Sequence, residues 1–202
     1  MGSGSSRATR KANRQEKERQ ATITAGTTRV NSIFDAPERA AGRGDFLSGV
    51  RDHYRTGLDR DKAVADRRLK FSMARGGLTG GSAQVDANRT LGEDYTQGLI
   101  GAEERAQGAL SDLELSDEQS RLSLLSMIQQ GLDTTTAASR AGAAVMNNTA
   151  NARSNAFADS LGDVFGNTAD IYKRQEEMAA RRRGEQAAYA SLYGNPRYQG
   201  GN

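Results

Sequence analysis

FSMARGGLTGGS, residues 71–82, is the clearest break in this chain of 202 residues. The run contains four glycines, which are Gly76, Gly77, Gly80 and Gly81. Glycines directly after a helix suit a left-handed C-cap, and Ser82 suits the N-cap of a helix that follows. Long helices joined by a tight turn double back as an αα-hairpin. We therefore predict that these glycines form the turn, or hinge, of a helical hairpin.

The apolar residues on both sides of this turn mostly recur every three or four positions, as they do on one face of a helix. Before the turn they include Phe46, Val50, Tyr54, Leu58, Leu69 and Met73, and after it Leu91, Tyr95, Leu99, Ala102, Ala106, Leu110 and Leu113. The stripe is narrow, which is typical of a coiled-coil or bundle seam. No segment alternates as a strand does. The sequence predicts an all-α protein with long helices in an extended hairpin or coiled-coil bundle.

Caps and breaks predict the helix boundaries. Residues 1–9 are expected to be a disordered basic N-terminus, and 10–75 to hold basic helices over about 10–33 and 45–75, with Asp35 as an N-cap before Pro37. After the turn at 76–82, residues 82–193 are expected to hold an acidic helix to about 131 and an Ala/Gly/Asn-rich helix from 134. Ser116 and Gln119 resemble a capping box that interrupts the acidic helix, and Asp133 is an expected N-cap. Residues 194–202 are expected to be irregular.

Charge is strongly segregated along the chain. Residues 1–75 carry 17 basic and 9 acidic side chains, whereas residues 76–133 carry 3 basic and 10 acidic ones. The acidic helix is therefore expected to lie against the basic one. The basic clusters are candidates for contact with DNA or with an acidic protein, unless they are simply solvated. They are Arg7, Arg10, Lys11 and Arg14 near the N-terminus, and Arg181, Arg182 and Arg183.

Self-association is expected from the small supply of large apolar residues. Hydrophobic residues make up 36% of the chain, too few for a thick core around a helix about 75 Å long. Small residues at helical spacing allow close packing between copies; the candidates are Ala138, Gly142, Ala158, Gly162 and Gly166. An alanine-rich helix favoured by propensity is the alternative. Four asparagines at helical spacing could form a ladder across an oligomer interface, line a water-filled channel or lie on a solvated surface, and they are Asn147, Asn148, Asn151 and Asn155.

The composition argues against an enzyme. There is no Cys, and His53 is the single His, which disfavours thiolate metal sites, His-based metal sites and catalytic triads. Adjacent carboxylates such as Asp117 and Glu118 point in different directions on a helix. We expect no catalytic residue, cofactor, metal or small-molecule substrate. No apolar stretch approaches the ~20 residues of a membrane span, and no signal-peptide core follows the N-terminus.

The run from Phe71 to Ser82, followed by Asp86 and a long Gln/Glu/Ala-rich helix, resembles the small internal virion proteins, also called ejection or core proteins, of short-tailed bacteriophages. The likeness covers about residues 45–180. It implies a structural protein inside the capsid near the portal, which leaves with the DNA and joins a conduit across the host cell envelope. Expected partners are other copies of the chain, other virion proteins near the portal or tail, DNA without sequence preference, and the host membrane after ejection.

Two other functions fit the same sequence. One is a head–tail or portal-associated protein that stays in the particle. The other is a nonspecific DNA-binding coiled coil, whose affinity would fall steeply with salt.

Overall fold

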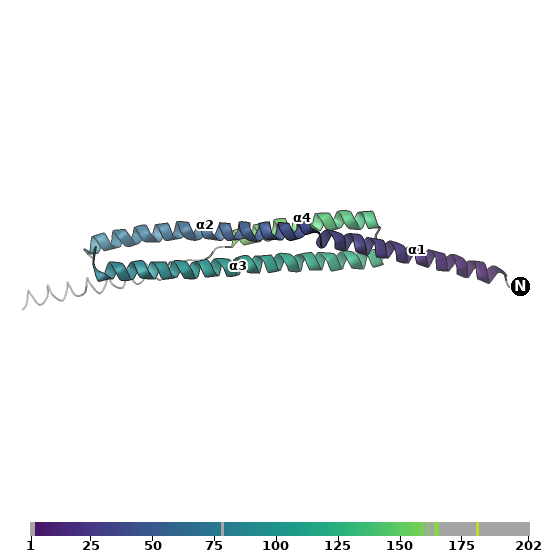
Figure 1. Cartoon of the computed structure of the whole chain (residues 1–202), viewed down its shortest axis with the longest axis horizontal. Helices are drawn as coiled ribbons and strands as arrows, with labels where there is room; N and C mark the ends of the chain where they lie inside the picture. The colour runs from purple at the N-terminus through teal and green to yellow at the C-terminus, as the bar shows by residue number, and fades with distance from the viewer. Residues whose placement is uncertain (1–2, 78, 160, 162–163, 166–180, 182–202) are drawn as a thin grey trace, which may run out of the picture. The chain divides into compact units, whose positions relative to one another are not determined.

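The computed structural model describes residues 3–77, 79–159, 161, 164–165 and 181, and within them it contains four long helices and no strand (Figure 1). The helices are α1 (Ser3–Phe34), α2 (Pro37–Gly76), α3 (Ser82–Gln129) and α4 (Thr134–Ala158). The all-α prediction is confirmed for this part of the chain. Residue 181 is also helical.

Proline separates α1 from α2. The backbone N–H of Asp35 donates to Asn31 O and closes α1, while the N–H groups of Arg39 and Ala40 donate to Ala36 O. Pro37 therefore occupies the first helical position, where its missing N–H costs nothing. The N-cap position belongs to Ala36, and not to Asp35 as predicted. Helix α2 accordingly begins at 37 and not at 45.

The glycine run forms the connection between α2 and α3. Gly77 and Gly80 have φ of 66° and 82°, a left-handed backbone that side chains with a Cβ rarely adopt. The N–H groups of Gln84 and Val85 donate to Gly81 O. Gly81 is thus at the N-cap position, and Ser82, the predicted cap, is the first helical residue.

Asp133 caps α4 as predicted. Its carboxylate accepts a hydrogen bond of 2.9 Å from the backbone N–H of Thr136. Hydrogen bonding to the Thr136 side chain, and after it to the Thr136 backbone, holds the pKa of Asp133 below its usual value. Gly131, with φ of 106°, ends the preceding turn. Helix α3 therefore stops at Gln129, two residues before the expected end.

Three further boundaries differ from the sequence prediction. Helix α1 starts at Ser3, so residues 3–9 are helical where disorder was expected; they extend a helix already formed by the residues that follow, and extension costs far less than nucleation. Helix α3 continues through Ser116, whose hydroxyl donates to Asp112 O in the preceding turn instead of capping a new helix. Helix α4 ends at Ala158 because Asp159 is extended, with ψ of 137°. The remainder of the predicted 134–193 helix lies largely outside the described residues.

The chain divides into two compact units, to which α2 and α3 both contribute. Unit 1 comprises Met1–Tyr54 and Ala102–Ser160. In it, α3 runs antiparallel to α2 and to α4 (Figure 1). One cluster joins α1, α3 and α4, and its buried members are Val30, Phe34, Leu124, Ile128, Ala137 and Ala141. Gly26 allows α1 to approach α3, because a Cβ there would lie 3.1 Å from Ile128 Cγ2.

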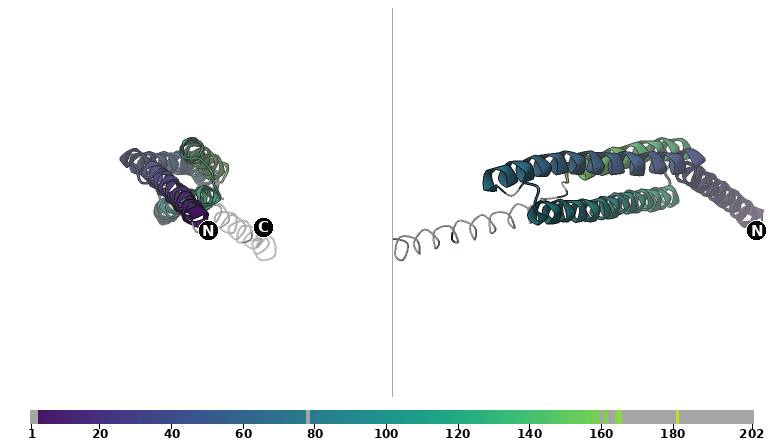
Figure 2. Two further views of the ribbon diagram at one scale, coloured as in Figure 1. Left: turned by 90° about the vertical axis from the view of Figure 1, so that its right-hand side faces the viewer. Right: turned by 60° about the vertical axis from the view of Figure 1, so that its left-hand side comes forward.

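Unit 2 comprises Arg55–Gly101 and Leu161–Asn202. It is the tip of the α2–α3 hairpin, whose arms run side by side (Figures 1 and 2). The core is apolar, and its buried members are Leu58, Leu69, Met73, Ala87, Leu91 and Phe165. Gly98 is the point of closest approach, since a Cβ would lie 2.6 Å from Leu58 Cδ1 and 3.1 Å from Val164 Cγ1.

Buried positions along α3 recur every 11 residues. One series is Leu91, Ala102, Leu113 and Leu124, and a second is Ala106, Asp117 and Ile128. Eleven residues in three turns is about 3.67 residues per turn, close to the straight α-helix and unlike the seven-residue repeat of a left-handed coiled coil. A long α3 can therefore keep one face against its neighbours.

Candidate functional site

Asp117 is the centre of a buried ionic cluster in unit 1. It is 2% exposed and Arg39 is 6% exposed, and these are the two buried charged residues of the described chain. Arg39 Nε donates to Asp117 Oδ2 at 2.7 Å, and Arg43 Nη2 donates to the same oxygen at 2.9 Å. One carboxylate on α3 therefore holds two guanidinium groups that lie one turn apart on α2.

Helix α4 completes the cluster with polar side chains. Asn148 Nδ2 lies 3.1 Å from both Asp117 Oδ1 and Ser120 Oγ. Arg39 Nη1 donates to Thr149 Oγ1 at 2.7 Å, and the Thr149 hydroxyl donates to Val145 O. Both oxygens of the Asp117 carboxylate therefore accept hydrogen bonds, and side chains of α2 and α4 both contact this residue of α3.

The positive charge of this cluster is not fully balanced by its carboxylate. Arg43 Nε is buried without a hydrogen-bond partner in the described structure. Glu114, about half exposed, approaches Arg43 Nη1 only to 3.9 Å. Because removing a buried partner is far more costly than removing a surface one, the cluster is suited to fixing the register of α2, α3 and α4. The sequence analysis noted Asp117 only as one of two adjacent carboxylates. Its 11-residue spacing from Ala106 and from Ile128 places it on the buried face of α3 once that face is known.

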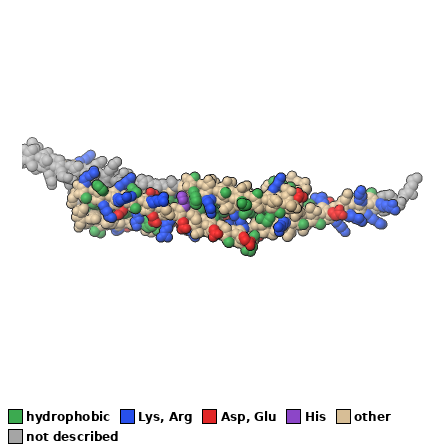
Figure 3. Space-filling model, turned by 90° about the horizontal axis from the view of Figure 1, so that it is seen from above, with side chains coloured by type: hydrophobic (Ala, Val, Ile, Leu, Met, Phe, Trp, Pro, Cys, Tyr) green, Lys and Arg blue, Asp and Glu red, His purple; other side chains and the backbone are tan. Residues whose placement is uncertain are grey.

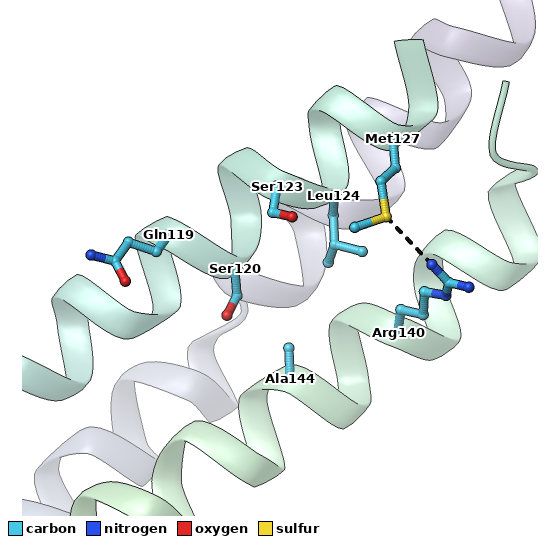
Figure 4. A pocket seen from close by; sticks show the side chains of 7 residues that line it. All are labelled: Gln119, Ser120, Ser123, Leu124, Met127, Arg140 and Ala144. Atoms are coloured by element: carbon cyan, nitrogen blue, oxygen red, sulfur yellow. Dashed lines mark hydrogen bonds between the residues drawn. The ribbon is translucent and has the colours of Figure 1, made fainter. Parts of the chain in front are cut away.

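A groove of about 350 Å³ lies between α3 and α4 (Figure 4). Its lining residues are Gln119, Ser120, Ser123, Leu124, Met127, Arg140 and Ala144. The small side chains leave the space open, and Arg140 Nη1 reaches across to Met127 Sδ at 3.4 Å. The groove is shallow and mixed in character, without a convergent set of charged groups.

A second cavity of about 310 Å³ lies beside Tyr54 and the end of α4. Burial raises the pKa of the Tyr54 hydroxyl, the negative charge of Asp159 adds to the effect, and Arg105 opposes it. Next to this cavity His53 stacks on Phe157, with ring centroids 4.4 Å apart. His53 is exposed.

The basic N-terminal residues lie on a fully exposed segment of α1. Every residue from 7 to 22 is exposed, and Lys and Arg side chains gather on this segment in the space-filling view (Figure 3). Arg7, Arg10, Lys11 and Arg14 share one side of the helix because they are three or four residues apart. Of the second predicted cluster, Arg181 is exposed, while Arg182 and Arg183 lie outside the described residues.

The small residues proposed for packing lie beside the seam that α4 uses within the chain. That seam is formed by Ala137, Ala141 and Ala156. Ala138 and Gly142 are half-buried next to it and Ala158 is exposed. Part of the surface of each residue is therefore not covered by packing within the chain. Gly162 and Gly166 lie outside the described residues. Their role between copies stays a prediction.

The four asparagines do not share one environment. Asn148 is half-buried in the ionic cluster, whereas the other three, Asn147, Asn151 and Asn155, are exposed.

Close packing explains only some of the helical glycines. Gly98 and Gly26 are in tight contacts, but a Cβ at Gly92, Gly101, Gly108 or Gly142 would meet nothing within 4 Å. These four positions therefore lower helix stability without an intramolecular gain.

The part of the chain that the structure describes has no group of three or more His, Cys, Asp and Glu side chains placed to hold a metal ion. No described helix is long and apolar enough to cross a membrane. No protein-family model matches the chain, and comparisons with curated proteins and with solved structures return no match.

Proposed function

We propose that the chain is a structural protein of a phage virion, placed inside the capsid near the portal, which assembles with itself and is released with the DNA to help form a conduit across the host cell envelope. The observation that supports self-assembly is a second apolar face on α3. One face of this helix buries the unit 1 core. The opposite face exposes Leu115 and Leu122, at 58% and 57%.

Leu115 and Leu122 are seven residues, nearly two turns, apart, so they lie in line on the outside of the helix. Gly108 is a further seven residues back and has open space beside it. Single exposed leucines are common on protein surfaces. Two in line beside an open glycine form a seam to which another long helix can pack. A second copy of α3 is the occupant that a homo-oligomer of parallel or antiparallel hairpins supplies.

The delivery role follows from the resemblance of residues 71–82 and the helices around them to internal virion proteins. Physical features are compatible with passage through a narrow tail. The chain has no Cys that could cross-link it and only two prolines, and its helices are held by small apolar clusters, two of which have six buried residues each. Each unit can therefore open without disrupting a large core.

The mass of the assembled species tests the self-assembly. We expect the full chain to sediment as an oligomer in analytical ultracentrifugation, with or without mild detergent. Leu115→Ser together with Leu122→Ser is expected to shift the population toward monomer while helicity by circular dichroism is kept. The matched control, Ile100→Ser together with Met146→Ser, removes two other exposed apolar side chains. A monomer in all conditions, or an equal effect of the control, contradicts the assignment.

Release of a trapped dye from liposomes tests the conduit. The oligomer is expected to release dye and the Leu115/Leu122 variant to release less. After infection, the protein is expected in host envelope fractions. An oligomer that releases no dye and stays with the emptied particle would instead identify a head–tail or portal-associated protein that is never ejected.

A further inference from the structure

The exposed half of α1 carries a one-sided stripe of positive charge. We name as the basic stripe five cations, Arg7, Arg10, Lys11, Arg14 and Lys17. At about 100° per residue they fall within an arc of about 120° and over about 15 Å of helix. None of the five has an ion-pair partner within the described structure, where the pairs of this segment are confined to Glu16 and Arg19.

The other side of the same segment is different. Glu16 accepts hydrogen bonds from Arg19 and Gln20, and these contacts lower the pKa of Glu16 to about 2. Ala8 and Ala12 add small apolar side chains there. Glu18 is the one acidic residue within the arc of the basic stripe. The positive charge of this segment therefore lies on one side of the helix, where the basic stripe and Glu18 together have a net charge of about +4.

This segment also stands away from the rest of unit 1. The first large apolar residue of α1 is Ile23, and it is the first α1 side chain to pack against the α1–α3–α4 cluster. Residues 7–22 are exposed on every side, and the N-terminal half of α1 extends past α3 and α4 (Figures 1 and 2). A helix of about 10–12 Å diameter that is free on all sides fits the major groove of duplex DNA, which is about 12 Å wide.

We propose that the basic stripe binds the phosphate backbone of double-stranded DNA without reading its sequence. Duplex DNA presents one negative charge per about 1.7 Å of axis, so about 15 Å of helix meets several phosphates. The acidic helix α3 of a second copy is less favoured as the partner. Within the described chain, the acidic side chains of α3 are largely paired already, with Arg51, Arg43, Arg89 and Arg121. Binding by the stripe goes beyond the proposed function, because it requires neither oligomer nor conduit.

Salt dependence of DNA binding by the full chain is the test. With a labelled duplex of about 30 base pairs in fluorescence anisotropy, log K is expected to fall with log salt with a slope of about −4.5 for five contacts between about 50 and 200 mM salt. The variant Arg10→Gln/Lys11→Gln/Arg14→Gln is expected to bring the slope to about −2 and weaken binding at least tenfold at about 100 mM salt. Helicity is expected to be unchanged, because these residues contact no other helix.

The control Arg60→Gln/Arg67→Gln/Arg68→Gln removes the same charge from exposed positions of α2. It is expected to change the affinity less than threefold. Equal weakening by the control would overturn the proposal, because net charge alone would then explain binding. Unchanged DNA affinity in the stripe variant, with lost binding to poly-glutamate, would assign the stripe to an acidic protein and also overturn it. Dye release by the stripe variant is expected to be normal, which separates this result from failure of the conduit.

Discussion

Helices α2 and α3 contact each other in both units, but the chemistry of the contact differs between unit 1 and unit 2. In unit 1, α2 buries Phe46 and Val50 and, in addition, pairs Arg39 and Arg43 with the buried Asp117 of α3. In unit 2 they meet through apolar side chains, with Leu58 and Met73 almost fully buried. An apolar contact between long helices tolerates a slip by one turn, because another apolar residue takes the same place. A buried carboxylate that must meet two guanidinium groups does not tolerate it.

Removal of the buried Asp117 carboxylate is expected to cause the largest loss of stability. Asp117→Ala leaves Arg39 buried without its counter-ion and should destabilise the protein by about 3–5 kcal/mol in urea denaturation. Glu103→Ala removes an exposed partner of Arg51 and should change little. Similar effects of the two changes would show that the cluster is as solvated as a surface ion pair. Asp117→Leu with Arg39→Met should recover much of the loss while weakening the preference for one register.

Truncation of a side chain in the apolar core of unit 2 is expected to cause the second largest loss of stability. Leu58 is fully buried against Gly98, so Leu58→Ala should cost about 3 kcal/mol in the same measurement. Phe71→Ala, at a position 73% exposed, is the control and should be nearly neutral. A small loss at Leu58 would mean that the hairpin tip collapses readily into the space left behind.

The α4 cap gives a smaller, pH-dependent effect. Asp133→Ala should lower the midpoint of thermal unfolding at pH 7 by about 2–4 °C, and Asp133→Asn, which retains a cap, by less. The pKa of Asp133 is lowered in the folded protein. Its ionised form therefore contributes stability above about pH 4, and this contribution is lost as the pH falls through the lowered pKa. An identical pH profile for wild type and Asp133→Asn would contradict this role.

Two glycines of α3 allow the finest test. Gly92→Ala fills open space in a helix and should stabilise by about 0.5–1 kcal/mol. Gly98→Ala has the same propensity gain, but its Cβ meets Leu58 and Val164, so the gain should be cancelled or reversed. Equal stabilisation by both would show that Leu58 moves aside without cost.

Much of the fold was predictable because its determinants are local. The three-to-four spacing of apolar residues, Gly77 in the turn, and the Asp133 cap depend on residues close in sequence. Boundaries were less predictable where two local patterns compete. Ser116 has the form of a cap, but its hydroxyl bonds to Asp112 O within a continuous helix. The seam that α4 uses within the chain was not predictable, because Ala137 and its neighbour Ala138 have the same helix propensity and only contact with α1 and α3 distinguishes them.

The sequence by itself determined the helices, the hairpin turn and the basic stripe, since all depend on residues within a few turns of one another. Only the tertiary structure decided that Asp117 is buried with Arg39, 78 residues away, and that Gly98 is packed while Gly92 is open. Those outcomes depend on which side of a helix meets another helix. Neighbours in sequence do not specify that side, because every residue of a long helix has the same backbone and only its partner across the interface makes it buried or exposed.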